Sequence, residues 1–293
     1  MTLPPFELHR PDSLAEASRL LTEYGEDASV LCGGTELLLL LKLGFAAYGH
    51  LVDIKGIESL GGIRAENGAV VIGSTVTHRQ IERSPTVLER LPALAAMERS
   101  VANIRVRSVG TLGGNLCFSD PHSDPATFLL ALDAEVEYDA TRLPLSRFLV
   151  GPYETALEPG QLLSAVHIPI PPAGTGIAHR KLAFHERPAA TVTCLVRSAD
   201  GLIEQANIAV GSVGARAIRA VDAERVLTGA ALDDAPTLRA AAELAADASQ
   251  PVEDANGSAL YKTNLVRVLV ERCFRDALRG QAAQRGNRWR NGG

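Results

Sequence analysis

The sequence predicts an α+β protein with two N-terminal regions of mixed helix and strand and a C-terminal region of antiparallel sheet and helices. The N-terminal part of this prediction rests on a strand–turn–helix–strand pattern within residues 1–55. The division before the C-terminal region rests on a cluster of prolines and glycines at residues 169–176, which is typical of a domain boundary. With 46% hydrophobic and 22% charged residues among 293, the composition is globular and excludes a disordered or collagen-like chain.

The first region, residues 1–55, has the pattern of a βαβ unit. A capping box at residues 13–16 begins a helix. A strand over residues 28–32 leads through a pair of glycines into an all-apolar helix over residues 36–43, and a further strand follows at residues 51–54. The glycine pair is therefore expected between the end of a strand and the start of a helix.

The second region, residues 56–172, mixes helices and strands. Asp124 followed by Pro125 has the pattern of a helix N-cap and its first helical residue. The stretch before it, residues 103–123, predicts irregular structure. The other predicted elements are a strand at 69–73, a helix opened by the capping box 77–80, a helix at 87–101, a helix at 127–132, and strands at 134–138 and 162–168.

The third region, residues 177–280, predicts antiparallel sheet followed by helices. Asp200 and Gly201 have the sequence of a hairpin turn between two alternating strands. The basic tail, residues 281–293, predicts a disordered end. Helical spacing is found near residues 219–228, 236–248 and 258–279.

Charge and cysteine content narrow the class of protein. The formal net charge of −5 provides no basic surface for nucleic acid, and any membrane contact is expected to be peripheral at most. The four cysteines lie far apart without a Cys-x-x-Cys pair, which favours reduced thiols over a disulfide framework or an iron–sulfur cluster. There is no signal-peptide pattern, and the longest apolar run, Leu37–Leu41, is too short to span a membrane. A soluble cytoplasmic protein is expected.

Common catalytic and nucleotide-binding motifs are missing from the chain. It has no Gly-x-Gly-x-x-Gly, no phosphate loop ending in Gly-Lys-Ser/Thr, no His-Glu-x-x-His and no Gly-x-Ser-x-Gly. The seven histidines are scattered without the spacing of metal ligands, so no metal site is expected. His78 lies in a capping box and is expected to be a histidine of a capped helix.

Two glycine pairs are the remaining candidates for a binding site, Gly33–Gly34 and Gly113–Gly114. Residues without side chains let a backbone approach an anion closely and direct consecutive N–H groups toward it. The first pair precedes a helix, whose positive end adds to this attraction. A diphosphate can be held in this way without a lysine, but each pair can also be only a tight turn, and the residues alone leave both interpretations open.

Several longer segments, in this order, resemble the FAD-binding medium subunits of molybdenum hydroxylases, the family of carbon monoxide dehydrogenase medium chains and xanthine dehydrogenase flavin domains. The resemblance covers residues 3–280. It implies the two-lobed FAD-binding fold of the vanillyl-alcohol-oxidase type, followed by a C-terminal domain of antiparallel sheet and helices. The segments that carry it are Val30–Leu38, His50–Ile54, Ile104–Leu116, Ser119–Pro125 and Leu129–Ala134.

The resemblance also implies the residues that contact FAD, and none of them is expected to be catalytic. Asp124 is expected to hydrogen-bond the cofactor, Val101 to lie against the flavin ring, and Leu162 and Lys181 to touch the flavin. A Cβ at Gly33 or Gly113 is expected to clash with the diphosphate or to force a disfavoured backbone conformation. Backbone amides expected to surround the diphosphate are those of Leu31, Cys32, Gly33, Gly34, Thr35 and Glu36 in the first lobe, and of Thr111, Gly113, Gly114 and Asn115 in the second.

Two departures from the family pattern bear on these expectations. Cys32 stands where most relatives carry Ala, which keeps the site small but adds an oxidisable thiol. Thr35 and Glu36 resemble general hydroxylase medium chains more than the Gln-Ser or His-Ser that is frequent in carbon monoxide dehydrogenases. The substrate of the complex is therefore left open, while FAD binding is not affected.

The function implied by the resemblance is electron transfer. A large partner subunit would oxidise substrate at a molybdenum cofactor, and a small subunit would relay electrons through [2Fe-2S] clusters to FAD in this chain, within a dimer of heterotrimers. FAD would pass an electron pair to an external acceptor, a quinone, NAD or oxygen. The alternatives are a stand-alone FAD-dependent reductase, for which the sequence offers no acid–base pair, and a flavin-free scaffold subunit, against which the intact glycine pairs argue.

Overall fold

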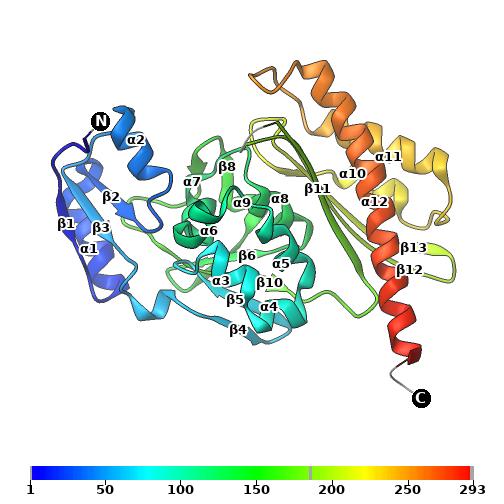
Figure 1. Ribbon diagram of the computed structural model, residues 1–293, viewed down its shortest axis with the longest axis horizontal. Helices are drawn as coiled ribbons and strands as arrows, with labels where there is room; N and C mark the ends of the chain where they lie inside the picture. The colour runs from blue at the N-terminus through cyan, green and yellow to red at the C-terminus, as the bar shows by residue number, and fades with distance from the viewer. Residues whose placement is uncertain (1, 185–186, 291–293) are drawn as a thin grey trace. The chain divides into compact units, whose positions relative to one another are not determined.

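The computed structural model describes residues 2–184 and 187–290, and for residues 283–290 it describes the backbone only (Figure 1). The chain divides into two compact units, which are described separately. Unit 1 consists of Met1–Phe118, Glu135–Phe148 and Tyr153–Ile168, and unit 2 consists of Ser119–Ala134, Leu149–Pro152 and Pro169–Gly293. Unit 1 thus combines most of the two predicted N-terminal regions, and unit 2 adds Ser119–Ala134 to the predicted C-terminal region.

The first sheet of unit 1 is parallel throughout, in the strand order β1-β3-β2. The predicted βαβ unit is confirmed, because β2 leads through α2 into the adjacent parallel strand β3. Ser13 caps α1 by accepting a hydrogen bond from the Glu16 N–H, as the capping box predicts. The elements are β1 Glu7–His9, α1 Leu14–Tyr24, the 3-10 turn Gly25–Asp27, β2 Ala28–Leu31, α2 Leu37–Leu43 and β3 His50–Asp53.

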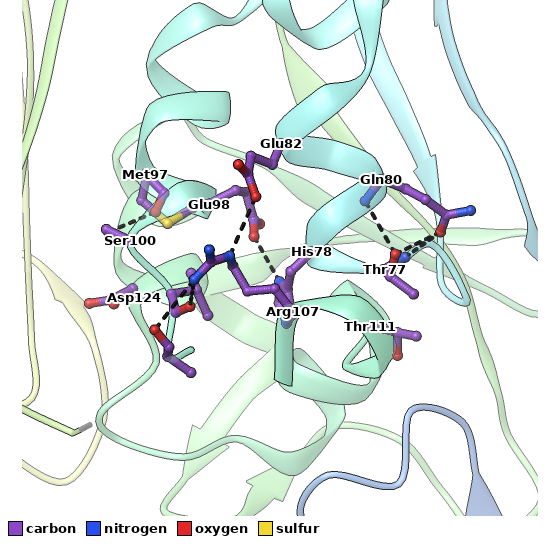
Figure 2. Close-up of polar contacts among 12 residues, drawn as sticks. Thr77, His78, Gln80, Glu82, Met97, Glu98, Ser100, Arg107, Thr111 and Asp124 are labelled. Atoms are coloured by element: carbon purple, nitrogen blue, oxygen red, sulfur yellow. Dashed lines mark hydrogen bonds and ion pairs between the residues drawn. The ribbon is translucent and has the colours of Figure 1, made fainter. Parts of the chain in front are cut away.

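The second sheet of unit 1 has the strand order β4-β5-β10-β6-β7. The predicted capping box of α3 is confirmed: the Thr77 N–H donates to Gln80 Oε1 at 2.8 Å, and the Gln80 N–H donates to Thr77 Oγ1 at 3.2 Å (Figure 2). The strands are β4 Ile63–Glu66, β5 Ala69–Gly73, β6 Glu135–Tyr138, β7 Thr141–Pro144 and β10 Leu163–Pro169, and the short strand β9 is Glu154–Thr155. The helices are the 3-10 turn Glu58–Leu60, α3 His78–Arg83, α4 Pro85–Arg90, α5 Pro92–Arg99, α6 Ile104–Val109, α7 Leu112–Phe118 and α9 Leu145–Phe148.

Unit 2 contains an antiparallel sheet in the order β11-β12-β13-β14. The predicted hairpin is confirmed, and its turn has positive φ at both Asp200 (50°) and Gly201 (80°), as a two-residue hairpin requires. The strands are β8 Leu149–Gly151, β11 Gly176–Ala183, β12 Pro188–Ala199, β13 Leu202–Gly211 and β14 Ile218–Arg219. The helices are α8 Asp124–Ala131, α10 Val221–Leu227, α11 Ala235–Ala248 and α12 Ala259–Arg290.

Strand β12 is buried on both faces, which explains why it is apolar or small along most of its length. Val192 and Cys194 point into a core shared with α10, α11 and α12. Thr191, on the opposite face, contacts α8 through a hydrogen bond with the Thr127 hydroxyl at 3.1 Å. The helices of unit 2 therefore cover the two faces of this strand, with α8 opposite the other three.

Three predictions about local structure are wrong. The stretch 103–123 is not irregular, because it contains α6 and α7. Asp124 is not the N-cap of α8: the Ser123 hydroxyl accepts the Ala126 N–H at 3.0 Å, which leaves Asp124 as the first helical residue. The chain does not become disordered at residue 281, because α12 continues to Arg290, and the buried Gln281 side chain bonds Ser198 at 2.9 Å. The end of the predicted tail, residues 291–293, lies outside the described residues.

The predicted helix over residues 87–101 is two helices, α4 and α5, which meet at Pro92. Among the described residues, no helix is both long enough and apolar enough to cross a membrane.

Candidate functional site

The first glycine turn joins the carboxyl end of β2 to the start of α2. Gly34 has φ of +72°, a left-handed conformation that glycine adopts without strain. The N–H groups of Gly34 and Thr35 donate no hydrogen bond to any residue that the structure describes. Two consecutive N–H groups without an internal partner are suited to bind the oxygens of a phosphate group.

The second glycine turn lies directly against the first, within unit 1. A Cβ built on Gly33 would lie 2.5 Å from the Val109 carbonyl oxygen and 2.8 Å from the Gly110 Cα. The Thr111 hydroxyl donates to the Cys32 sulfur at 3.3 Å, across 79 residues of sequence. The fold thus brings together two segments that the sequence could only identify separately. It also shows that Gly33 is required by this backbone approach, whereas the expected clash was with a diphosphate.

The second turn uses most of its own N–H groups internally. The Gly113 N–H donates to the Ser74 carbonyl at 3.1 Å, and the Gly114 N–H donates to Thr111 Oγ1 at 3.1 Å. The Asn115 N–H donates to the Thr111 carbonyl at 2.9 Å. The expected diphosphate contacts from these three amides therefore compete with hydrogen bonds that the chain already makes. Among residues 111–115, only the Thr111 N–H donates no hydrogen bond to a described residue.

Gly113 is needed for packing, as Gly33 is. Its Cβ would lie 2.5 Å from the Ser74 Cβ and 2.6 Å from the Ser74 carbonyl oxygen. The glycines of the second turn therefore allow α7 to approach the segment that follows β5. A side chain at Gly113 would therefore clash with the protein itself before any clash with a diphosphate.

Lys55 is a component of the site that the sequence analysis missed. Its ammonium donates to the Cys32 carbonyl oxygen at 3.2 Å and forms an ion pair with Asp53 Oδ1 at 2.8 Å. Its side chain is 49% exposed, so the positive charge is accessible beside the first glycine turn. The available signal was its position just after β3, since the carboxyl ends of neighbouring parallel strands meet at one edge of a sheet.

Cys32 is a buried thiol and not an exposed reactive one. Burial raises the pKa of Cys32, although the Thr111 hydrogen bond acts in the opposite direction. Its side chain belongs to an apolar cluster that also contains Leu162, Val52 and Ile54. Leu162, which was expected to touch the flavin, is therefore part of the core on which the first glycine turn rests.

A buried hydrogen bond between His78 and Glu98 supports the second glycine turn. His78 Nδ1 lies 2.8 Å from Glu98 Oε2, and both side chains are almost fully buried (Figure 2). The backbone N–H of His78 donates to the Gly110 carbonyl at 3.0 Å. The imidazole ring of His78 also lies beside Gly110, since a Cβ built on Gly110 would be 3.3 Å from the ring. His78 is in a capped helix, as predicted. Its contact with Gly110 has no signal in the local sequence.

Val101 is the remaining expected site residue of unit 1. It is buried, and its carbonyl oxygen accepts a hydrogen bond from Arg107 Nη1 at 3.0 Å. The segment that follows α5 is thus fixed by a side chain from the last turn of α6. The expected contact of Val101 with the flavin ring stays a prediction.

Asp124 and Lys181 belong to unit 2, where they contact each other. Lys181 donates a short hydrogen bond to Asp124 Oδ2, and His179 Nε2 lies 3.6 Å from Asp124 Oδ1. Burial alone would raise the pKa of Asp124, but His179 and the positive Lys181 outweigh burial and lower it. Asp124 is therefore a carboxylate at neutral pH. Its Oδ1 is buried beside His179 Nε2 and accepts no shorter hydrogen bond from a described residue.

Within unit 1, the unpaired N–H groups and the accessible Lys55 fit a ligand that carries phosphate groups. Residues 4–171 match the family model of the FAD-binding domain in molybdopterin dehydrogenase, and residues 180–277 match that of the CO dehydrogenase flavoprotein C-terminal domain. The chain belongs to the FAD-binding subunits of the molybdenum hydroxylase family, and its cofactor is FAD.

Individual relatives place the chain within this family. It is 36% identical to the carbon monoxide dehydrogenase medium chain of Afipia carboxidovorans, over 93% of this chain and 96% of the relative. It is 32% identical to the xanthine dehydrogenase FAD-binding subunit of Escherichia coli O157:H7, over 92% and 95%. In structure it is similar to a chain of reconstituted CO dehydrogenase from Oligotropha carboxidovorans, with a TM-score of 0.92 and 34% identity over 96% and 100%. The expected fold and cofactor are therefore confirmed.

Proposed function

We propose that this chain transfers electrons within a cytoplasmic molybdenum-containing dehydrogenase. It would receive them from the [2Fe-2S] clusters of a small subunit, while a large subunit oxidises substrate at the molybdenum cofactor. The external acceptor would be a quinone, NAD or oxygen, and the assembly a dimer of heterotrimers. The observation that carries the proposal is the pair of unpaired N–H groups at Gly34 and Thr35 beside Lys55, in a chain that matches medium subunits over nearly its whole length.

Each proposed contact follows from the chemistry of the residue. The N–H groups of Gly34, Thr35 and Thr111 would donate to phosphate oxygens, and Lys55 would reduce the repulsion between the phosphate charges. Gly33 keeps the first turn against the second, which fixes where the donors point. When bound, FAD supplies the two-electron chemistry, so the chain itself needs to supply only binding and positioning.

Asp124 and Lys181 are proposed to act on the cofactor through charge and hydrogen bonding. His179 and Lys181 keep Asp124 ionised, and the Asp124 oxygen that does not bond Lys181 would accept a hydrogen bond from FAD. The other residues proposed to contact the cofactor are Leu31, Cys32 and Glu36 in the first turn, and Gly113, Gly114 and Asn115 in the second. Substrate is proposed to bind another subunit, so its class (carbon monoxide, a purine, an aldehyde or an N-heterocycle) is set there.

Purification from the native host tests the proposal against its two alternatives. We expect a yellow complex that contains this chain, an iron–sulfur protein with two cluster motifs and a larger molybdenum protein. In a complex that carries Lys55→Met, FAD content and acceptor reduction should fall together, while dithionite still reduces the iron–sulfur centres. The matched control is Lys42→Met, an exposed lysine of the same unit.

The other outcomes favour the alternatives. Isolated yellow protein that oxidises or reduces an organic substrate by itself would indicate a stand-alone reductase. Colourless protein that still recovers both partners would indicate a scaffold subunit. Full acceptor reduction in the flavin-depleted complex would contradict the electron-transfer role even if the assembly is as proposed.

A further inference from the structure

Two histidines and a glutamate converge at the start of the first sheet of unit 1. His9 lies on β1 and His50 begins β3, and these strands pair in parallel with Glu7 opposite His50. His9 Nε2 lies 3.0 Å from His50 Nδ1, and His50 Nδ1 lies 3.7 Å from Glu7 Oε2. Side chains two residues apart on a strand point to the same face, so Glu7 and His9 both face His50. The histidines are 41 residues apart, which explains why their sequence spacing gave no indication of a site.

The distances within this group fit a single metal ion. The three ligand atoms all lie within 4.8 Å of one another. Ligands of a tetrahedral ion with bonds of about 2.0–2.1 Å are separated by about 3.4 Å, between the two distances observed here. Small side-chain rotations would therefore suffice to place one ion among the three atoms.

The imidazole rings are already held in place by an aromatic neighbour. The Tyr24 ring stacks on His50 with centroids 3.7 Å apart and an interplanar angle of 13°, and it also stacks on His9 at 5.1 Å. Both histidines are partly buried, whereas the Glu7 side chain is 67% exposed. An ion could therefore enter from solvent and meet two oriented nitrogen ligands, which lowers the entropy lost on binding.

This group is separate from the glycine turns. His50 is the first residue of β3, whereas the first turn follows Leu31, which pairs with Asp53 at the last position of β3. Three residues of strand separate these positions by about 10 Å. Two of its three residues, Glu7 and His9, lie on β1, which among the described strands is at the edge of the sheet.

We propose that Glu7, His9 and His50 bind a divalent transition-metal ion of the zinc class. Two imidazole nitrogens and one carboxylate, without a thiolate, suit zinc and its neighbours, whereas magnesium and calcium prefer oxygen ligands only. Water from the exposed side completes the coordination. The ion links the three-residue edge strand β1 to the central strand β3, so its role is structural and independent of FAD.

The test is zinc titration of the untagged, full-length, FAD-loaded chain by calorimetry, with magnesium as the comparison ion. We expect one zinc ion per chain and no magnesium binding at the same concentrations. His50→Ala should weaken zinc binding by about 10-fold or more, because it removes the central ligand. Glu7→Gln should also weaken it, and because this side chain is exposed the variant is expected to fold. The matched control is Glu23→Gln, an exposed carboxylate of the same unit outside the group.

The proposal is overturned if zinc does not bind in a saturable manner at one ion per chain. It is equally overturned if Glu7→Gln and Glu23→Gln bind zinc with the same affinity as the parent chain while retaining its FAD content. A rise in the thermal unfolding midpoint with zinc, present in Glu23→Gln and reduced in Glu7→Gln, would support the structural role.

Discussion

Replacing Gly33 by alanine should destabilise unit 1 even when no FAD is bound. The added Cβ would lie 2.5 Å from the Val109 carbonyl oxygen, about 0.9 Å inside ordinary van der Waals contact, and 2.8 Å from the Gly110 Cα. Both neighbours are backbone atoms, so a side-chain rotation cannot relieve the overlap. Overpacking of this kind costs about 1–3 kcal/mol.

Gly56→Ala is the matched control for this substitution. Nothing lies within 4 Å of a Cβ at Gly56, and its φ is not in the left-handed region. The control should therefore be neutral or stabilise by about 0.4–1 kcal/mol through the unfolded chain. The two variants should differ in unfolding free energy by about 1–4 kcal/mol, the sum of the two effects.

Urea unfolding of both variants, each with and without FAD, measures this difference. We expect a lower midpoint for Gly33→Ala in both states, and weaker FAD binding because the donors at Gly34 and Thr35 move with the turn. If the FAD-free variants unfold at the same midpoint, the backbone approach seen between the two turns does not stabilise the protein. If only the FAD-loaded forms differ, Gly33 serves the diphosphate directly, as the family resemblance implied.

Further predictions concern charges and thiols near the site. Lys55→Met should lower FAD affinity by about 10-fold, equivalent to one charge-assisted hydrogen bond, as measured by fluorescence titration of the released flavin. Asp124→Asn should lower FAD content more than Ser123→Ala, which removes the cap of α8 and about 1 kcal/mol of stability. Because the folded pKa of Asp124 is below its ordinary value, its ionisation stabilises unit 2 above about pH 4, and this contribution is lost as pH falls through the folded pKa. Acid unfolding monitored by circular dichroism should therefore be less steep in Asp124→Asn. Cys32→Ala should retain FAD, and Cys32 should resist thiol reagents in the native protein, because burial raises its pKa.

The elements that sequence reasoning predicted correctly are those with local signals. Helix α1 begins at a Ser13 cap and α3 at a Thr77 capping box, and both signals lie within four residues of the structure they specify. The Asp200–Gly201 hairpin was predictable for the same reason, since its turn conformation depends on two adjacent residues.

The wrong predictions concern residues whose role depends on a contact that is distant in the sequence. Gly113 lowers helix propensity, so the segment around it was predicted to be irregular, but it lies in α7 because its missing side chain lets that helix approach Ser74. The cap of α8 was assigned to Asp124 in place of Ser123, because both are good caps and Asp124 stands next to Pro125. Its charge is instead used by Lys181, 57 residues away, which no local pattern indicates.

The contact between the two glycine turns has a consequence for biosynthesis. Gly33 can form its close backbone contact only after residues 109–111 have been synthesised. The apolar cluster beneath the turn also includes Leu162, which is synthesised later still. A nascent chain that ends at residue 55 would contain the first glycine turn, but it would lack the second turn and Leu162 of the core beneath. The first glycine turn therefore gains its complete surroundings late in synthesis, after more than half of the chain has been made.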